Sequence, residues 1–293
     1  MPSSDPLIPS PAIRQLIDLA LEEDLGLGDV TTRLMGPPRP AVGQVVARQS
    51  LVVCGLPLAA WVTERAEPQL GCEALVEEGA LVSPGTVLVR LRGPSDALLR
   101  VERTVLNFLQ RLCGVATLTH RYVEAARGTG ARIVDTRKTL PGWRALDKYA
   151  VRRGGGHNHR ADLSSGILIK DNHITAAGSV AEAVRRARAG APHTLRVEVE
   201  VESLAAAEEA LGAGAEVLLL DNFTPESVRE VVARVKGRAL VELSGGVNLG
   251  TVRAFAESGA ELISVGALTH SAPAADLAMD LLAAAEAPRE GRA

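Results

Sequence analysis

Six stretches in the second half of the chain combine a run of apolar residues with an end that could do chemistry. In chain order these ends carry cations, then carboxylates, then glycines: Arg137-Lys138, Lys170, Glu200, Asp221, Gly245-Gly246 and Gly266. Cationic side chains bind anionic groups, carboxylates hold divalent metal ions, and bare backbone amides bind phosphate. The order therefore predicts a site for a substrate with anionic groups, a metal ion and a phosphate.

The elements that must position these ends are short β-rich runs separated by helical patterns, which is typical of parallel strands joined by crossover helices. Valines recur at helical spacing from Val228 to Val235, after Thr224 as a cap and Pro225 at the first helical position. A doubly wound open sheet could be built from the same units. We favour an α/β barrel, because a barrel places its chemistry at the carboxyl ends of successive strands. The expected strands cover 133–138, 167–172, 197–200, 217–222, 240–246 and 262–267.

The first hundred residues predict a separate α+β layer. A helix is expected from Ser10-Pro11 to about Gly26, followed by antiparallel strands within 41–53 and 73–92 and a helix near 57–66. A long helix follows from about Ser95 to Leu112, with Arg103 on the shoulder of its apolar seam. We therefore expect a first domain over 1–112, a barrel over 113–270, and a C-terminal helix over 271–293 that packs back on the first domain.

Composition narrows the class of protein. Hydrophobic residues make up 46% of the 293 residues and aromatic residues only 2%, so the core must consist of aliphatic side chains. No apolar run is long enough to span a membrane, and the first residues lack the basic and apolar regions of a signal peptide. The cysteines, Cys54, Cys72 and Cys113, show no metal or redox spacing, so we expect reduced thiols and a cytoplasmic protein.

Charge is unevenly distributed along the chain. The net charge is −3, but residues 132–173 carry nine Lys and Arg against four Asp. Nucleic acid is not an expected partner, because this basic segment offers only Trp143 and Tyr149 as stacking groups. Part of the segment is expected to be solvated helix faces, and the remainder fits a compact anionic small molecule.

Several short motifs follow one another along the chain: Asp24-Leu25-Gly26-Leu27-Gly28-Asp29-Val30-Thr31, Glu102-Arg103-Thr104, Asp135-Thr136-Arg137-Lys138-Thr139, Gly154-Gly155-Gly156-His157-Asn158-His159-Arg160, Leu168-Ile169-Lys170-Asp171-Asn172-His173, Glu198-Val199-Glu200, Asp221-Asn222, Ser244-Gly245-Gly246 and Val265-Gly266-Ala267. Together they closely resemble the quinolinate phosphoribosyltransferases, the decarboxylating enzymes of NAD synthesis. The resemblance spans essentially the whole chain.

The resemblance implies a fold, a reaction and partners. The fold is α/β, an incomplete α/β barrel with an N-terminal α+β domain of the open-faced sandwich kind. The reaction joins quinolinate to 5-phosphoribosyl-1-pyrophosphate with Mg²⁺ as cofactor and gives nicotinate mononucleotide, pyrophosphate and CO₂. The family also implies a homodimer, or a higher assembly such as a hexamer, in which each active site borrows residues from the partner subunit.

The resemblance further implies roles for individual residues. Quinolinate would be held by Arg103 from the other subunit together with Arg137, His159, Arg160 and Lys170. The phosphoribosyl and metal side would comprise Thr136, Lys138, Glu200, Asp221, Ser244, Gly245, Gly246, Val265, Gly266 and Ala267. Catalytic roles fall on Lys138, Lys170, Glu200 and Asp221, and the metal would be held by Glu200 and Asp221, directly or through water.

Alternatives remain open for several of these residues. Lys170 could form a Schiff base as in an aldolase-like barrel, and His159 could be a hydrogen-bonded core histidine. His157 and His173 are expected to be structural. Glu198 alternates with valines, so we expect it to point away from the face of Glu200 or to support it.

Two other functions compete with the first. One is a related barrel phosphoribosyltransferase with another acceptor, such as nicotinate or that of the molybdenum-operon relative. The other is a non-catalytic barrel that binds anionic metabolites, although simple anion capture has no use for Glu200 and Asp221. The sequence does not identify the proton donor that would complete a decarboxylation.

Overall fold

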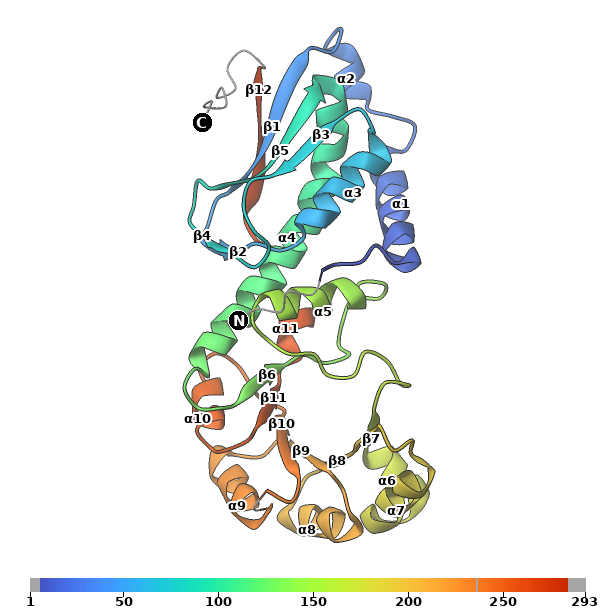
Figure 1. Ribbon diagram of the computed structural model, residues 1–293, viewed down its shortest axis with the longest axis vertical. Coiled ribbons are helices and arrows are strands. Elements are labelled where there is room, and N and C mark those ends of the chain that lie inside the picture. Colours follow the sequence, from blue (N-terminus) through green and yellow to red (C-terminus); the bar gives the residue numbers. More distant parts are fainter. Residues whose placement is uncertain (1–5, 236, 284–293) are drawn as a thin grey trace. The chain divides into compact units, whose positions relative to one another are not determined.

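The computed structural model describes residues 6–235 and 237–283, and the chain divides into two compact units. Unit 1 comprises residues 1–118, 141–155 and 272–293, and unit 2 comprises residues 119–140 and 156–271. The division differs from the expected domains, because residues 141–155 cluster with unit 1. Helix α4 (Ser95–Ala125) begins in unit 1 and ends in unit 2 (Figure 1).

Unit 1 is built on a four-stranded sheet in the order β12-β1-β5-β3, in which every pairing is antiparallel. Its strands, with the separate pair β2 and β4, are β1 (Pro40–Ala47), β2 (Leu51–Val52), β3 (Gly71–Ala74), β4 (Leu81–Val82), β5 (Val87–Pro94) and β12 (Leu277–Ala283). Its helices, besides the first part of α4, are α1 (Pro11–Leu25), α2 (Val30–Leu34), α3 (Leu56–Ala66) and α5 (Arg144–Arg153). These elements confirm the predicted α+β layer.

Helix α1 shows how closely local sequence fixes an element of unit 1. The Ser10 hydroxyl accepts a hydrogen bond from the backbone N–H of Ile13 at 3.3 Å and caps the helix, with Pro11 at its first position. Ile13, Ile17 and Leu21 recur at helical spacing and are buried. Gly26 follows the last helical residue with a positive φ of 45°, so the helix ends where the sequence predicts.

The expected C-terminal helix is wrong where the structure describes it. Residues 277–283 form strand β12, which pairs antiparallel with β1, and residues 284–293 lie outside the described residues. The segment is rich in Ala and Leu, which favour helix, but pairing with the open edge of β1 satisfies a row of backbone groups. Gly43 on β1 makes room for β12, because a Cβ there would lie 2.9 Å from Met279 Sδ.

Helix α4 is also longer than predicted, since it runs on from Leu112 to Ala125. The apolar seam continues through Cys113, Val115 and Ala116, which are fully buried. Gly114 lies within this stretch without ending the helix. A Cβ at Gly114 would lie 2.1 Å from the carbonyl oxygen of Pro273, so the glycine permits a close backbone contact inside unit 1.

Unit 2 contains a six-stranded parallel sheet in the order β6-β11-β10-β9-β8-β7. The strands are β6 (Arg132–Val134), β7 (Ile167–Ile169), β8 (Val197–Val201), β9 (Val217–Asp221), β10 (Leu240–Ser244) and β11 (Leu262–Ser264). Each lies within or overlaps a run predicted from the sequence. Among the described residues β6 and β7 do not pair with each other, so the barrel is incomplete.

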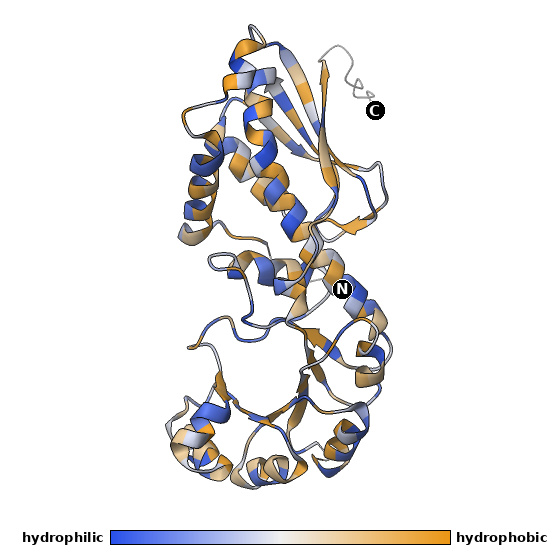
Figure 2. Cartoon of the chain, turned by 180° about the vertical axis from the view of Figure 1, so that it is seen from behind, coloured by the Kyte–Doolittle hydropathy of each residue, from blue (hydrophilic) through white to orange (hydrophobic). Residues whose placement is uncertain are grey.

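Helices alternate with the strands of unit 2 as expected, and Figure 2 shows both hydrophilic and hydrophobic residues along them. They are α6 (Asp171–Ala177), α7 (Val180–Gly190), α8 (Leu204–Ala213), α9 (Pro225–Val235), α10 (Val252–Ala256) and α11 (Ala267–His270). On α9 the valines Val228, Val231 and Val235 are buried, as their spacing predicts. None of the helices in the described ranges has the length and apolar character to cross a membrane.

Candidate active site

A cavity of about 500 Å³ opens in unit 2, at the ends of the barrel strands. Every site residue predicted from the sequence except Arg103 lines it. These residues are Thr136, Arg137, Lys138, His159, Arg160, Lys170, Glu200, Asp221, Ser244, Gly245, Gly246, Val265, Gly266 and Ala267. They come from the connections after β6 and before β7 and from the ends of β7 to β11, so strand order brings together residues up to 131 positions apart in the sequence.

Arg103 is the exception. It lies on α4 in the part that belongs to unit 1, it is exposed, and it is not among the residues that line the cavity. Its predicted role in the site of a partner subunit stays a prediction.

The predicted quinolinate side of the cavity is crowded with cations. Burial lowers the pKa of the Arg160 guanidinium, and the neighbouring charge of Arg137 lowers it further. Arg137 Nε is buried and finds no hydrogen-bond partner in the described part of the chain. A buried donor without a partner costs free energy, and two guanidinium groups repel each other. Both features would be relieved by an anion with several acceptor oxygens.

Asp135 fixes the loop that carries part of this cation cluster. It is fully buried, and its carboxylate accepts a hydrogen bond from the backbone N–H of His159 at 2.8 Å and another from Asn158 Nδ2. His157 continues the same connection, because its backbone N–H donates to the carbonyl of Ile133 at 2.8 Å. The loop is thus held as if it were an additional strand beside β6, which sets the direction of His159 and Arg160.

The carboxylates at the strand ends have different partners. Lys170 forms an ion pair with Glu200, and Lys170 also caps α6, where its backbone N–H donates to His173 Nδ1 at 2.9 Å. Within the part of the chain that the structure describes, His173 therefore has a structural role at the start of α6. Asp221 Oδ2 accepts from Asn222 Nδ2 at 2.9 Å, and Asn222 has a positive φ of 59° that is uncommon outside glycine. Glu200 and Asp221 fit Mg²⁺, which proteins bind through one or two carboxylates together with substrate phosphates and water.

The glycines at the last two strand ends allow the backbone to approach a ligand closely. Gly245 has φ of 85°, and a Cβ there would lie 2.5 Å from Asn222 Oδ1 and 2.9 Å from Asn222 N. A Cβ on Gly266 would lie 3.0 Å from Lys138 Cδ and 3.2 Å from His270 Nε2. Gly245 lies beside the Asp221 carboxylate and Gly266 beside the Lys138 side chain, an arrangement that suits a phosphate bound together with a metal ion.

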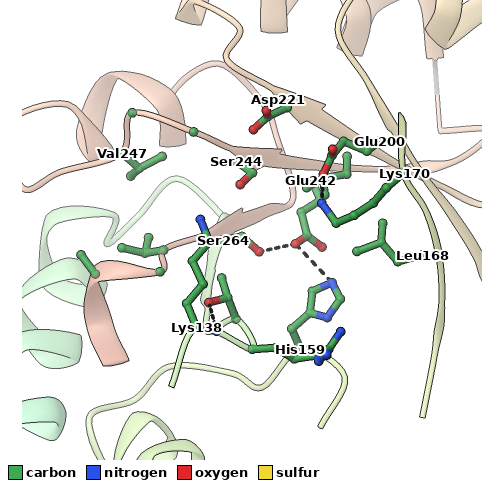
Figure 3. A pocket seen from close by; sticks show the side chains of 18 of the residues that line it. Lys138, His159, Leu168, Lys170, Glu200, Asp221, Glu242, Ser244, Val247 and Ser264 are labelled. Atoms are coloured by element: carbon green, nitrogen blue, oxygen red, sulfur yellow. Dashed lines mark hydrogen bonds and ion pairs between the residues drawn. The ribbon is translucent and has the colours of Figure 1, made fainter. Parts of the chain in front are cut away.

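A second group of polar side chains lies deeper in the barrel. We call His159, Glu198, Glu242 and Ser264 the floor of the cavity, and the charged groups Arg137, Lys138, Arg160, Lys170, Glu200 and Asp221 its mouth. His159 Nε2 lies 3.2 Å from Glu198 Oε2 and 3.6 Å from Glu242 Oε1. Ser264 Oγ donates to Glu242 Oε1, and Figure 3 shows the Glu242 carboxyl between Ser264 and the His159 ring. Glu198 and Glu242 are 8% and 2% exposed.

The protonation of the floor follows from its hydrogen bonds. His159 Nδ1 accepts the backbone N–H of Arg160 at 2.7 Å, so its proton is on Nε2, where it faces the two carboxyl groups. Burial raises the pKa of Glu242, and the charge of Glu198 raises it further, while His159 and Ser264 oppose the shift. The neutral form of Glu242 is therefore favoured, and Glu198 Oε2 is the acid oxygen nearer to the histidine N–H.

His159, Glu198 and Glu242 also form the one group in the described ranges whose ligand atoms lie close enough to hold a metal ion, within 4.8 Å of one another. A metal-binding histidine donates its other ring N–H to an acceptor. Here the other nitrogen faces an N–H donor, so Nε2 must keep its proton. The arrangement fits a shared proton network and not a metal centre.

Sequence reasoning missed Glu198 and Glu242, although a signal was available. Of the two alternatives for Glu198, the one in which it points away from the face of Glu200 is wrong, because residues two apart on a strand point to the same side. Glu198 stands two residues before Glu200 and Glu242 two residues before Ser244, so each buried acid shares a face with a residue that lines the cavity.

Comparisons with known proteins agree with this architecture. The model of the quinolinate phosphoribosyl transferase N-terminal domain matches residues 29–113, and that of its C-terminal domain matches residues 115–280. The nicotinate-nucleotide pyrophosphorylase [carboxylating] of Mycobacterium leprae is 44% identical over 277 residues, which are 92% of this chain and 97% of that protein. The human protein of the same name is 38% identical over 290 residues, 96% of each chain.

Solved structures extend the likeness to the fold. NadC from Streptococcus pyogenes has a TM-score of 0.90 at 39% identity, covering 95% of this chain and 99% of that chain. The nicotinate-nucleotide pyrophosphorylase of Francisella tularensis has a TM-score of 0.90 at 34% identity, covering 95% and 100%. These matches confirm the resemblance found in the sequence. The chain belongs to the quinolinate phosphoribosyl transferase family and is an enzyme of the pentosyltransferase class.

Proposed function

We propose that the protein transfers the phosphoribosyl group of 5-phosphoribosyl-1-pyrophosphate to the ring nitrogen of quinolinate, in de novo NAD biosynthesis. The products are nicotinate mononucleotide, pyrophosphate and CO₂. The observation that supports this most directly is the unpartnered buried Nε of Arg137 beside Arg160 in a cavity that also holds Lys170. Two adjacent carboxylates on one ring supply the acceptors that such a cluster lacks.

Each side chain of the mouth has a place in this reaction. Arg137 and Arg160 bind the two carboxylates of quinolinate, and His159, which lies next to them, helps to orient the ring. Lys170 is already paired with Glu200, so both charged groups are neutralised before substrates bind. Lys138 and the amides around Gly245 and Gly266 bind the phosphoribosyl phosphates.

Mg²⁺ bound by Glu200 and Asp221, directly or through water, would stabilise the charge that develops on departing pyrophosphate. The pyridine nitrogen attacks the anomeric carbon of the ribose as pyrophosphate leaves, through an oxocarbenium-like state. The nitrogen then carries a positive charge, which stabilises the electron pair left on the adjacent carbon when CO₂ departs. The protein's contribution is to hold nitrogen and anomeric carbon in line and to keep the cations fixed around the dicarboxylate.

The site is completed in a homodimer by Arg103 of the partner subunit. Exposure of Arg103 on α4 and its position outside the cavity of its own chain support this arrangement. The cytoplasmic location stays a prediction, consistent with free thiols at Cys54, Cys72 and Cys113.

The experiment that tests the proposal is an assay with quinolinate, 5-phosphoribosyl-1-pyrophosphate and Mg²⁺. We expect nicotinate mononucleotide, pyrophosphate and CO₂ in equal amounts, and no product without Mg²⁺. Nicotinate in place of quinolinate is the control, because it lacks the second carboxylate. Product from nicotinate alone would overturn the choice of acceptor, and binding of both substrates without any product would indicate a non-catalytic binder.

A further inference from the structure

The floor of the cavity contains an acid that the reaction described above has not used. Glu242 lies on β10, two residues before the end of the strand, and its side chain lines the same cavity as Arg137, Arg160 and Lys170. Ser264 Oγ on β11 donates to its Oε1, which leaves Oε2 as the oxygen that carries an acidic proton. Figure 3 shows this carboxyl aimed from the sheet toward the space between His159 and Lys170.

The groups around Glu242 favour its neutral form. Glu198 on β8 faces it across the floor, Asp135 acts on it from the end of β6, and both are acids that raise its pKa, while burial contributes most. His159 opposes this, but its single Nε2 proton is closer to Glu198, at 3.2 Å compared with 3.6 Å. A second carboxylate at this depth would be a buried charge beside another acid, so the neutral form of Glu242 is favoured.

We propose that Glu242 is the acid that protonates the pyridine carbon exposed by loss of CO₂. This inference rests on the proposed function, because it assigns the proton donor of that reaction's second stage. The bond between the ring carbon and the leaving carboxylate breaks, and its electron pair stays on the ring carbon next to the positively charged nitrogen. The O–H bond of Glu242 then breaks as a C–H bond forms on that carbon.

Glu242 loses and regains one proton in each turnover. Glu242 becomes a carboxylate beside Glu198, which is an unfavourable state at this depth, and it recovers a proton from water before the next substrate binds. The reaction therefore consumes one proton for each CO₂ released. A general acid of this kind accelerates a proton transfer by about 10²–10⁴-fold.

The other groups that line the cavity are less suitable donors. His159 has no proton on Nδ1, and its Nε2 proton is bound by Glu198. Lys170 is paired with Glu200, and His270 lies beside Gly266, on the side that the phosphoribosyl group would occupy. Arginine does not release its proton at neutral pH. Among the described lining residues, Glu242 is the acid best placed to give a proton.

Glu242→Gln is the decisive variant, because glutamine keeps the shape and can still accept from Ser264 but carries no acidic proton. Rapid-quench single turnovers would measure pyrophosphate and CO₂ separately. We expect pyrophosphate release within a few-fold of the parent rate and CO₂ release slowed by about 10²-fold or more. A dicarboxylated mononucleotide should accumulate between the two steps. Parent-like CO₂ release would overturn the proposal, and so would equal losses in both steps with weaker quinolinate binding, which would make Glu242 a positioning residue.

Ser264→Ala keeps the proposal testable even if the glutamine variant does not fold. The Ser264 hydrogen bond lowers the pKa of Glu242, so its removal raises that pKa. We expect the rate of CO₂ release to fall at alkaline pH as Glu242 ionises. This alkaline limb of the pH–rate profile should move to higher pH in Ser264→Ala. A limb that stays at the parent pH would overturn the role of Glu242. A parent enzyme that releases no pyrophosphate would instead overturn the proposed function, and this inference with it.

Discussion

The mouth and the floor of the cavity both contain carboxyl groups, but the two regions differ in how far these groups are exposed to solvent. At the mouth, Lys170 forms an ion pair with Glu200 and its side chain is 44% exposed, so solvent screens the pair and a substrate can replace either partner. At the floor, Glu242 is 2% exposed beside Glu198, and burial raises the pKa of its carboxyl to about 7. Burial therefore separates two proposed roles: the charged groups of the mouth bind the substrate, and the buried acid of the floor donates a proton.

The largest expected effect tests the mouth. Arg137→Ala or Arg160→Ala should weaken quinolinate binding by about 2–5 kcal/mol, because each removes one charged partner from a desolvated site. Binding of 5-phosphoribosyl-1-pyrophosphate should change little. Isothermal titration calorimetry measures both affinities. Arg234→Ala is the matched control, since Arg234 is an exposed arginine of unit 2 that pairs with Glu208 away from the cavity. Unchanged quinolinate affinity in both variants would contradict the assignment of these two arginines.

Replacing the carboxylates of the mouth should have the second-largest effect. Glu200→Ala or Asp221→Ala should cut turnover by about 10²-fold and raise the Mg²⁺ concentration that gives half the maximal rate, because one metal ligand is lost. Quinolinate affinity should be less affected. Steady-state rates over a Mg²⁺ series test this, with Glu208→Ala as a control that removes an acid outside the cavity. A parent-like Mg²⁺ dependence in both variants would place the metal elsewhere.

A third experiment asks whether the mouth is completed by another subunit. Arg103→Ala and Lys170→Ala chains should each be nearly inactive alone, because every site of such a homodimer carries the one defect of its chains. Mixed dimers would contain one site with both defects and one with neither. Random subunit exchange at equal amounts should restore up to about a quarter of parental activity, since half of the dimers are mixed and half of their sites are intact. If verified mixed dimers recover nothing, Arg103 acts within its own chain or supports only the structure.

The smallest expected effect is that of Glu242 in the floor on the free energy of unfolding of the protein. The pKa of Glu242 is raised in the folded protein from 4.5 to about 7. The neutral form is therefore favoured by folding, and stability present below about pH 4.5 is lost as pH rises through about 7. Relative to Glu242→Gln, which does not titrate, the free energy of unfolding of the parent should fall by on the order of 1–3 kcal/mol between these pH values. Denaturant unfolding of both proteins at several pH values measures the difference. A parent that gains stability relative to the variant would mean that the carboxylate is the favoured form.

The two regions also differ in how far the sequence predicts them. The mouth residues follow apolar runs directly, and a change from apolar to charged at a strand end is a local signal, so Lys170 and Asp221 were placed correctly in the cavity. The floor residues are single acids inside apolar runs. Glu198 could have been placed by counting two residues back from Glu200, but its burial depends on the neighbouring strands. Whether Glu242 keeps a proton depends on Glu198, 44 positions away, and no local pattern holds that information.

The fold shows the same limit. The six barrel strands and α9 were predictable because hydrophobic period and capping are local properties. The extension of α4 past Gly114 and the strand at residues 277–283 were not. Both depend on contacts with distant segments: Pro273 against Gly114, and β1 against β12. Helix propensity in an Ala- and Leu-rich segment is weaker than a ladder of hydrogen bonds to an existing sheet edge.

The pairing of β12 with β1 has a consequence for the order in which the chain can fold during synthesis. Val42 pairs with Leu282, so the sheet of unit 1 lacks its edge strand until residues 277–283 have been made. At about 5–20 residues per second, the ribosome needs on the order of 10–40 s to reach β12 after finishing β5. All strands of unit 2 are translated within that interval. The barrel can therefore form first, while the edge of β1 that pairs with β12 stays unpaired until β12 has been translated.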